Sequence, residues 1–322
     1  MKLLGSITQP TFSEVDWIVL FAVCCNLKVS ASTWMTTDLV AHHMATLLGI
    51  QRSREAMVIC YPSEPVLAEA ALSCMAENIQ STLTKGLSVA HDFLVKDLVL
   101  EGYRGEFATC FILLLGRLRV KEGDFYSTPV SLNRFLCAIF NKVEIKNQIN
   151  DVLPTWENAQ LSFTHFIQYH ASEQLFHRDP QDLLEWLFER CQAVVMPPGW
   201  TGADILIPIY FPSQKVYSYA LIQAKNVMKF TRQDLVEARR KLIPPVVFGN
   251  SRGHFHWFSH HNLQCCMLMI INVGSAKGVI KIQKIETTTK NFLLVEAEGL
   301  LQPGLLDLTD DVTARPKASQ TC

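Results

Sequence analysis

Residues 202–226 decide the fold of this chain, and they read GADILIPIYFPSQKVYSYALIQAKN. Two almost continuously apolar runs, residues 205–211 and 216–222, each have the length of a single β-strand. Pro212 and Ser213 stand between the runs and supply residues typical of a turn. The stretch therefore predicts two adjacent strands that pair as an antiparallel hairpin.

Three polar side chains mark one end of this predicted hairpin. The start of the first strand lies beside the end of the second in an antiparallel pair, so Asp204 is expected to face Gln223 and Lys225. Gln223 and Lys225 are two residues apart and project from the same face of their strand. A carboxylate and an amide oxygen suit a hard divalent cation, and an ammonium stabilises charge that develops on a phosphate. The pattern predicts metal-assisted phosphodiester hydrolysis; the alternative is that Asp204 caps a strand and the other two residues only end one.

Further elements are predicted on both sides of the hairpin. Asp179 followed by Pro180 is typical of a helix start, and residues 192–196 form a brief apolar run before the hairpin. Thr231, with Asp234 three residues later, indicates another helix that begins with an imperfect capping box. Leu268 begins the apolar run LMIINV, which is expected to be a last buried strand. The predicted order is helix, three strands, helix and strand.

This order, with Asp at the second strand and Gln-x-Lys at the third, resembles the PD-(D/E)xK nuclease superfamily over residues 179–274. The resemblance implies a restriction-endonuclease-like α-β-β-β-α-β core within a mixed helix and strand fold. It implies that Asp204 and Gln223 bind Mg²⁺ or Mn²⁺ and that Lys225 is the catalytic lysine. Its implied partner is nucleic acid, with DNA favoured over RNA. Gln in place of the acidic residue removes one charge from the metal site, although some active members carry Gln there.

Many members of that superfamily add a Glu from the first helix as a metal ligand. Glu185 and Glu189 both fall on the helix predicted after Pro180, and we favour Glu185 because the amino-terminal half should lie nearer to the site. Glu106, at the start of an apolar helix over residues 104–120, is interpreted as a cap near the positive end of the helix dipole or as part of an ion pair beside the site. A second carboxylate near Asp204 would favour a nuclease over a catalytically silent binding or scaffold protein.

The chain is expected to divide into an α-helical domain at residues 1–170, a nuclease-like domain at 171–302 and a disordered tail at 303–322. The first part is loosely similar to the helical amino-terminal region of uncharacterised fungal proteins that carry a similar Asp…QxK segment. Helices are predicted over residues 12–48, with a break at 30–33, and over residues 66–76, 86–100, 104–120, 132–140 and 158–169.

Charge gives a local rather than a global indication of a nucleic-acid partner. The net charge of −1 carries no sign of a polyanion-binding protein. Between residues 213 and 253, however, eight Lys or Arg residues stand against two acidic residues. From this cluster, the residues predicted to contact phosphates are Lys229, Arg232, Arg239 and Arg240. The alternative is a solvated helix face.

Several remaining features bear on the class of protein. Ten Cys residues without a CxxC pair indicate free thiols in a reducing compartment. The apolar run 17–25 is too short to cross a bilayer and has acidic residues before it, so we expect an intracellular, nuclear or cytoplasmic protein with no membrane partner. The His-rich residues 254–261 and the GxSxG match at 249–253 are expected to lie in a loop, with a zinc site and a nucleophile elbow as the respective alternatives.

Overall fold

A computed structural model of the chain describes residues 12–25, 37, 40, 41, 46–50, 57–60, 64–95, 104–140, 158–168, 179–197, 200, 202–226, 229, 231–242, 265–272, 279–286 and 291–298. The His-rich tract, the GxSxG match and the tail at 303–322 lie outside the described residues. Within the described ranges, no helix combines the length and the hydrophobicity needed to cross a membrane.

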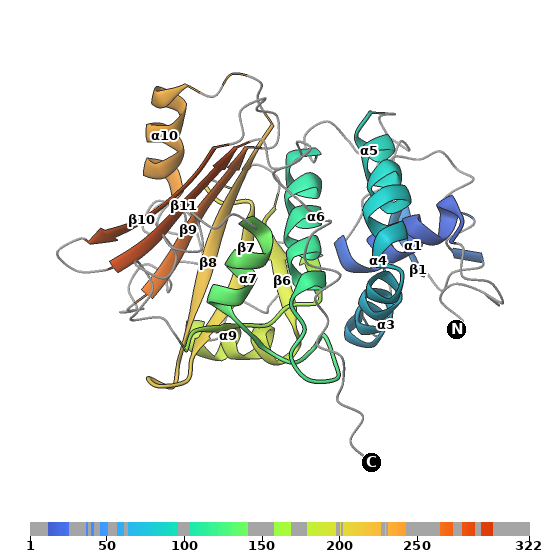
Figure 1. The fold of residues 1–322 in the computed structure, drawn as a ribbon, viewed down its shortest axis with the longest axis horizontal. Coiled ribbons are helices and arrows are strands. Elements are labelled where there is room, and N and C mark those ends of the chain that lie inside the picture. The colour runs from blue at the N-terminus through green and yellow to red at the C-terminus, as the bar shows by residue number, and fades with distance from the viewer. Residues whose placement is uncertain are drawn as a thin grey trace, which may run out of the picture.

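A mixed sheet, with nine strands among the described residues, forms the centre of the molecule (Figure 1). Its main path runs β10-β11-β9-β8-β7-β4-β3, while β6 pairs with both β5 and β7. The strands are β3 (Val130–Ser131), β4 (Gln160–Leu161), β5 (His165–Gln168), β6 (Gln192–Val195), β7 (Ile205–Phe211), β8 (Val216–Lys225), β9 (Cys265–Asn272), β10 (Val279–Glu286) and β11 (Asn291–Glu298).

The predicted hairpin is confirmed as β7 and β8, which pair antiparallel from Ile205 opposite Ile222 to Phe211 opposite Val216. The turn is closed by a hydrogen bond from the Gln214 backbone N–H to the Phe211 carbonyl at 3.1 Å. β6 pairs antiparallel with β7, and β9 pairs parallel with β8. The mixed helix and strand fold is thus confirmed, and the expected element order is present as α9 (Pro180–Glu189), β6, β7, β8, α10 (Arg232–Leu242) and β9.

Two apolar cores lie on opposite faces of the sheet, because alternate residues of each strand point to opposite sides. Ile205 and Ile222 belong to the core on the side of α6 (Arg104–Arg119) and α7 (Leu132–Phe140). Leu206 and Leu221 belong to the core on the side of α9 and α10. The central strands are therefore buried on both faces, as their almost continuous apolar sequence requires.

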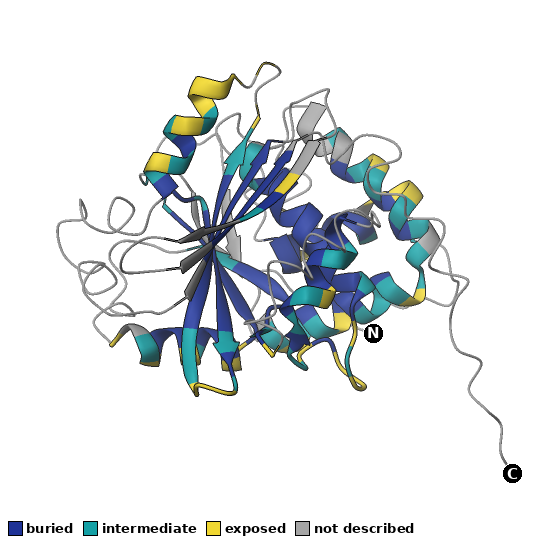
Figure 2. Cartoon of the chain, turned by 60° about the vertical axis from the view of Figure 1, so that its left-hand side comes forward, coloured by how far each residue is buried: buried dark blue, intermediate teal, exposed yellow. Residues whose placement is uncertain are grey.

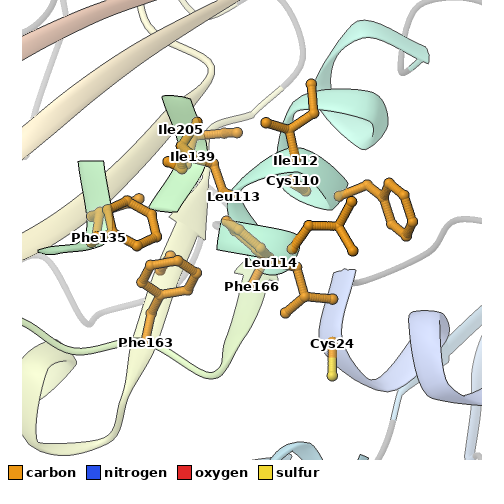
Figure 3. Close-up of a cluster of buried hydrophobic side chains, with 14 of the residues drawn as sticks. Cys24, Cys110, Ile112, Leu113, Leu114, Phe135, Ile139, Phe163, Phe166 and Ile205 are labelled. Atoms are coloured by element: carbon orange, nitrogen blue, oxygen red, sulfur yellow. The ribbon is translucent and has the colours of Figure 1, made fainter. Parts of the chain in front are cut away.

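Helix α6 stands between the sheet and the remaining amino-terminal helices (Figure 1). Those helices are α1 (Glu14–Cys25), α3 (Glu64–Glu77), α4 (Ile79–Ser81), a π-helical turn at Thr82–Gly86 and α5 (Leu87–Val95). Figure 3 shows side chains of α6 packed among Phe135 and Ile139 of α7, the strand residue Ile205, and Cys24 of α1. A Cβ at Gly116 would lie 2.5 Å from the Ile139 Cγ1 atom, so glycine is what lets α6 and α7 approach so closely.

Most of the expected helices are confirmed, but two segments are strands instead. The predicted helix at 158–169 is wrong, because these residues form β4 and β5. Of the helical prediction over 12–48 with its break at 30–33, α1 and the described residues 37, 40 and 41 are helical, whereas residues 46–48 belong to β1 (Thr46–Ile50), which pairs with β2 (Met57–Cys60). The expected domain boundary at residue 170 falls between β5 and α9, and strands from both sides of it join the same sheet. The part before residue 170 is therefore not purely helical.

Candidate functional site

Asp204 is fixed at the start of β7 by hydrogen bonds to both neighbouring strands. Its carbonyl accepts from the Met196 N–H at 2.8 Å, and its own N–H donates to the Ile222 carbonyl at 2.9 Å. Its carboxylate Oδ2 accepts from the Ala224 N–H at 2.7 Å, in the plane of the sheet. Burial raises the pKa of Asp204, while the Ala224 N–H and the Lys225 ammonium act in the opposite direction. The carboxylate is thus held in one position at the end of the hairpin.

A second carboxylate, that of Glu106, reaches the same end of the hairpin from the first turn of α6. Burial raises the pKa of Glu106 to about 7; its own backbone N–H lowers that pKa, the Asp204 charge raises it and the Lys225 charge lowers it. α6 begins directly against β8, since a Cβ at Gly105 would lie 3.6 Å from Asn226 Cβ. Glu106 is therefore more than the helix cap favoured from the sequence: it is part of the surroundings of Asp204.

Lys225 is the last residue of β8 and lies among carboxylates. Its charge lowers the pKa of Asp204 and that of Glu106. It also contributes to the lowered pKa of Asp234, after the larger effect of the hydrogen bonds from Thr231. This half-buried ammonium thus lies where Glu106 from α6, Asp204 from β7 and the first turn of α10 converge. The charge of Lys225 acts on Asp204, but among the described residues no ion pair joins the predicted partners Lys225 and Asp204.

Gln223 is buried, with 4% of its surface exposed, and its side-chain Oε1 has no hydrogen-bond partner among the described residues. The pairing of Ile205 with Ile222 places Gln223 opposite Asp204 in the hairpin. Its side of β8 is the one covered by α9 and α10, whereas Glu106 arrives on the α6 side. A buried acceptor without a partner is destabilising by about 1–3 kcal/mol. This oxygen is therefore suited to bind a group that reaches the end of the strands.

Glu185, the favoured third metal ligand, does not lie at this site. It is exposed on α9, and its carboxylate accepts from the Tyr217 hydroxyl at 3.5 Å. Burial, with the Glu185 charge as the next contribution, raises the pKa of Tyr217 to about 12. Tyr217 precedes Gln223 by six positions in β8, which corresponds to about 20 Å along a strand. α9 crosses the turn end of the hairpin, so the choice of Glu185 is corrected: the second carboxylate beside Asp204 is Glu106.

The predicted basic cluster divides into paired and unpaired side chains. Arg239 forms an ion pair with Glu296, which is buried. Arg240 donates two hydrogen bonds of 2.8 Å to the carboxylate of Glu237, the residue that also pairs with the neighbouring lysine of α10. Lys229 and Arg232 are exposed and form no ion pair within the described residues. Of the four residues predicted to contact phosphates, Arg239 and Arg240 are therefore paired with carboxylates, and Lys229 and Arg232 form no ion pair within the described residues.

The side chains at the site offer oxygen atoms to a ligand, although the Cys110 thiol of α6, whose pKa is raised by burial, is also near enough for the charges of Glu106 and Asp204 to raise that pKa further. Two carboxylates and an amide oxygen are the kind of donors that Mg²⁺ and Mn²⁺ accept, and Mg²⁺ keeps several waters when it is bound by few protein groups. The orphaned Oε1 of Gln223 fits this role. In the described part of the chain, no group of three or more His, Cys, Asp or Glu side chains is placed to hold a metal ion. The fit to a cation thus depends on Glu106, Asp204 and the amide.

Comparisons with known proteins give one match. The model of a protein family described as a domain of unknown function (DUF8736) matches residues 11–288, and the chain belongs to that family. Comparisons with curated proteins and with solved structures give no significant match. The matched range spans α1 to β10 and so includes every residue of the site described above.

Proposed function

We propose that this chain is a metal-dependent nuclease that hydrolyses the phosphodiester bonds of nucleic acids. In this proposal Glu106 and Asp204 are the metal-binding carboxylates, Gln223 supplies a third oxygen ligand and Lys225 is the catalytic lysine. The observation that carries the proposal is that α6 begins against the end of β8, so that the charges of Glu106, Asp204 and Lys225 act on one another at one end of an otherwise apolar hairpin.

The arrangement of the strands supports the proposed nuclease activity by analogy of fold. β6, β7 and β8 pair antiparallel in succession, and β9 follows α10 and lies parallel to β8. This is the order of the restriction-endonuclease-like α-β-β-β-α-β core. Fold alone does not determine activity, so the proposal depends on the side chains at the site.

Each residue of the site has a definite task in this mechanism. When bound, a divalent cation supplies Lewis-acid polarisation of a phosphate oxygen. Asp204, held by the Ala224 N–H, presents a carboxylate of fixed direction to the cation. Glu106, whose pKa is about 7, would hold a cation as the ionised carboxylate, so cation binding would release a proton near neutral pH. The Lys225 ammonium stabilises the negative charge that develops on the phosphate or positions the attacking water.

A catalytically silent member of the same fold is the second candidate. The observation that favours it is the Gln at position 223, which leaves the site with two carboxylates where an acidic residue would give three. Such a protein would keep the fold and use its basic residues or its helical part for binding. Addition of metal would then leave a nucleic-acid substrate intact.

The deciding experiment is a cleavage assay on purified protein with duplex DNA, single-stranded DNA and RNA, each in Mg²⁺, in Mn²⁺ and in EDTA. We expect metal-dependent cleavage by the wild type, loss of cleavage in Asp204→Ala and Glu106→Gln, and retention in the matched control Glu185→Ala. Intact substrate in all wild-type reactions would overturn the proposal in favour of the silent protein. Loss of cleavage in Glu185→Ala but not in Glu106→Gln would contradict the assignment of the second carboxylate.

A further inference from the structure

The basic side chains near the start and the end of α10 differ in their electrostatic surroundings. At the end of the helix, three cations (Arg239, Arg240 and Lys241) face two carboxylates, those of Glu296 and Glu237. The Glu237 pKa is lowered to about 2, chiefly by its hydrogen bond from Arg240, so this carboxylate stays charged at neutral pH. The charges in this part of α10 are therefore largely neutralised within the protein.

Near the start of α10, Lys229 and Arg232 are exposed cations, whereas the charge of Lys225 acts on Glu106, Asp204 and Asp234. Lys225, Lys229 and Arg232 lie within eight positions of one another, and the acidic residue that follows them in the first turn of the helix is Asp234. Both Oδ2 contacts of Asp234 come from Thr231, from its N–H at 2.9 Å and its hydroxyl at 2.7 Å. Lys229 and Arg232 are exposed, and within the described residues neither forms an ion pair. Their charges are available to a ligand in solution.

This part of the surface adjoins the proposed active site through Lys225. The charge of Lys225 acts on Asp234 in the first turn of α10 and also on Glu106 and Asp204. A polyanion bound at Lys229 and Arg232 is thus held close to the two carboxylates. Figure 2 shows that α10 is exposed along its outer side, while the strands beneath it are buried. A long ligand can therefore reach this helix from solution.

We propose that Lys229 and Arg232 bind the phosphate backbone of the nucleic-acid substrate and hold it over the site, and that Arg239, Arg240 and Lys241 stabilise the fold of α10 instead. This inference rests on the proposed nuclease function. A phosphate contact from an unpaired cation releases counterions from the nucleic acid. An arginine already paired with a carboxylate would have to lose that ion pair to make the same contact. The loss of the ion pair would offset much of the binding free energy gained from the phosphate.

The test is the salt dependence of binding to a short fluorescein-labelled DNA duplex, measured by anisotropy in EDTA to prevent cleavage. The variant Lys229→Ala/Arg232→Ala is compared with Arg240→Ala/Lys241→Ala, which removes the same amount of charge from the end of α10. We expect the slope of log K against log salt to fall in magnitude by about 2 in the first variant and to stay close to the wild-type value in the second.

The outcomes separate this inference from the proposed function. An equal change of slope in both variants, or a larger change in the second, overturns the inference while cleavage by the wild type still upholds the nuclease. Binding that depends on Lys229 and Arg232 without cleavage in Mg²⁺ or Mn²⁺ upholds the binding surface and overturns the nuclease. A wild type that neither binds nor cleaves duplex DNA, single-stranded DNA or RNA overturns both.

Discussion

Glu106 and Asp204 ionise in each other's presence, with Lys225 as the neighbouring cation. Burial raises the pKa of each carboxyl, and the charge of Asp204 raises that of Glu106 further. With a pKa of about 7, Glu106 is largely protonated at pH 6 and largely ionised at pH 8. A cation that binds Glu106 must displace this proton, so its affinity depends on pH over the same range.

We predict that Mn²⁺ affinity of the wild type rises by about fivefold from pH 6 to pH 7 and by about twofold from pH 7 to pH 8, as expected when one proton of pKa about 7 is displaced. Thermal-shift titrations with MnCl₂ at several pH values measure this dependence. In Glu106→Gln, which has no proton to lose at this position, the remaining affinity should vary much less with pH. A wild-type affinity that is constant from pH 6 to pH 8 would contradict a role for Glu106 as a ligand.

The same raised pKa predicts how stability without metal depends on pH. Because the folded-state pKa of Glu106 lies above its ordinary value of 4.5, the unfolded chain ionises first, and the wild type loses stability as pH rises from about 4.5 to about 7, above which the loss is complete. Glu106→Gln does not incur this loss. In EDTA its Tm relative to the wild type should increase by about 2–4 °C between pH 5 and pH 8. An unchanged difference in Tm would show that Glu106 is well solvated.

Lys225 and Gln223 give a pair of contrasting substitutions. Lys225→Ala should leave folding and Mn²⁺ binding nearly intact and lower the cleavage rate by about 10²–10³, the usual effect of one preorganised electrostatic group. The control Lys85→Ala removes an exposed lysine from the helical part and should cleave like the wild type.

Gln223→Glu restores the missing carboxylate and should bind Mn²⁺ more tightly, with equal or higher activity. Weaker binding in Gln223→Glu would remove Gln223 from the metal site.

At this scale the sequence identified Asp204, Gln223 and Lys225 as neighbours because hairpin register follows from local pattern. It could not identify Glu106 in the same way. Among the described residues, four strands and two helices separate α6 from Asp204 in sequence, and Glu106 reaches Asp204 only because α6 begins against the end of β8. The available signal was the small Gly105 beside Glu106, which permits that approach. Glu185 was favoured instead because sequence alone does not show which end of the hairpin α9 crosses.

Among the elements, α10 combines local and long-range stabilisation. Thr231 and Asp234 form the predicted capping box, in which the Asp234 N–H also donates to the Thr231 hydroxyl at 3.2 Å. Asp179 likewise caps α9, accepting from the Gln181 N–H at 2.8 Å. The ion pair between Arg239 and Glu296 then fixes α10 to β11. The helix caps could be predicted because their partners are close in sequence. The ion pair could not be predicted because it joins segments that are remote in sequence.

We predict that Arg239→Ala destabilises the protein by about 2–4 kcal/mol because it leaves Glu296 buried without its partner. Arg240→Ala, which breaks an exposed pair, should change stability by less than about 1 kcal/mol. Urea unfolding monitored by circular dichroism measures both values. The double variant Arg239→Met/Glu296→Met should recover most of the loss, since it removes both charges together. Equal stabilities of the two arginine variants would show that this ion pair does not hold α10 in place.

The strands β4 and β5 show where prediction of elements failed. Residues 159–164 read AQLSFT and alternate apolar with polar residues, a pattern typical of a strand that the prediction of a helix over 158–169 overlooked. Their strand conformation comes from pairing with β7 and β6, which lie later in the chain. By contrast, α7 begins and ends where predicted because its apolar residues recur at helical spacing.

For the whole molecule, the two cores make the parts before and after residue 170 depend on each other. Ile205, Ile207 and Ile222 share a core with α6 and α7, from the first part of the chain. Figure 2 shows these strands buried on both faces. The nuclease-like segment thus relies on the helical part for one entire side of its sheet, and on Glu106 for its second carboxylate.

We predict that residues 171–302 expressed alone do not fold into a stable unit, because one face of the sheet would be exposed to water. Circular dichroism and hydrogen exchange would show low protection and no cooperative thermal transition. The matched comparison is the segment 11–302, which keeps α6, α7 and the strands before residue 170. A cooperative transition of 171–302 at the temperature seen for 11–302 would show instead that the boundary at residue 170 separates independent domains.

In the proposed nuclease, Glu106 and Asp204 jointly hold a divalent cation beside Lys225. The most direct test of this joint binding is Mn²⁺ binding at pH 8, measured by electron paramagnetic resonance of the free ion in wild type, Glu106→Gln, Asp204→Ala and Glu185→Ala. We predict saturable binding in the wild type and in Glu185→Ala, and a loss of at least about tenfold in affinity in Glu106→Gln and Asp204→Ala. Absence of saturable binding in the wild type, or equal binding in all four proteins, would contradict this joint binding.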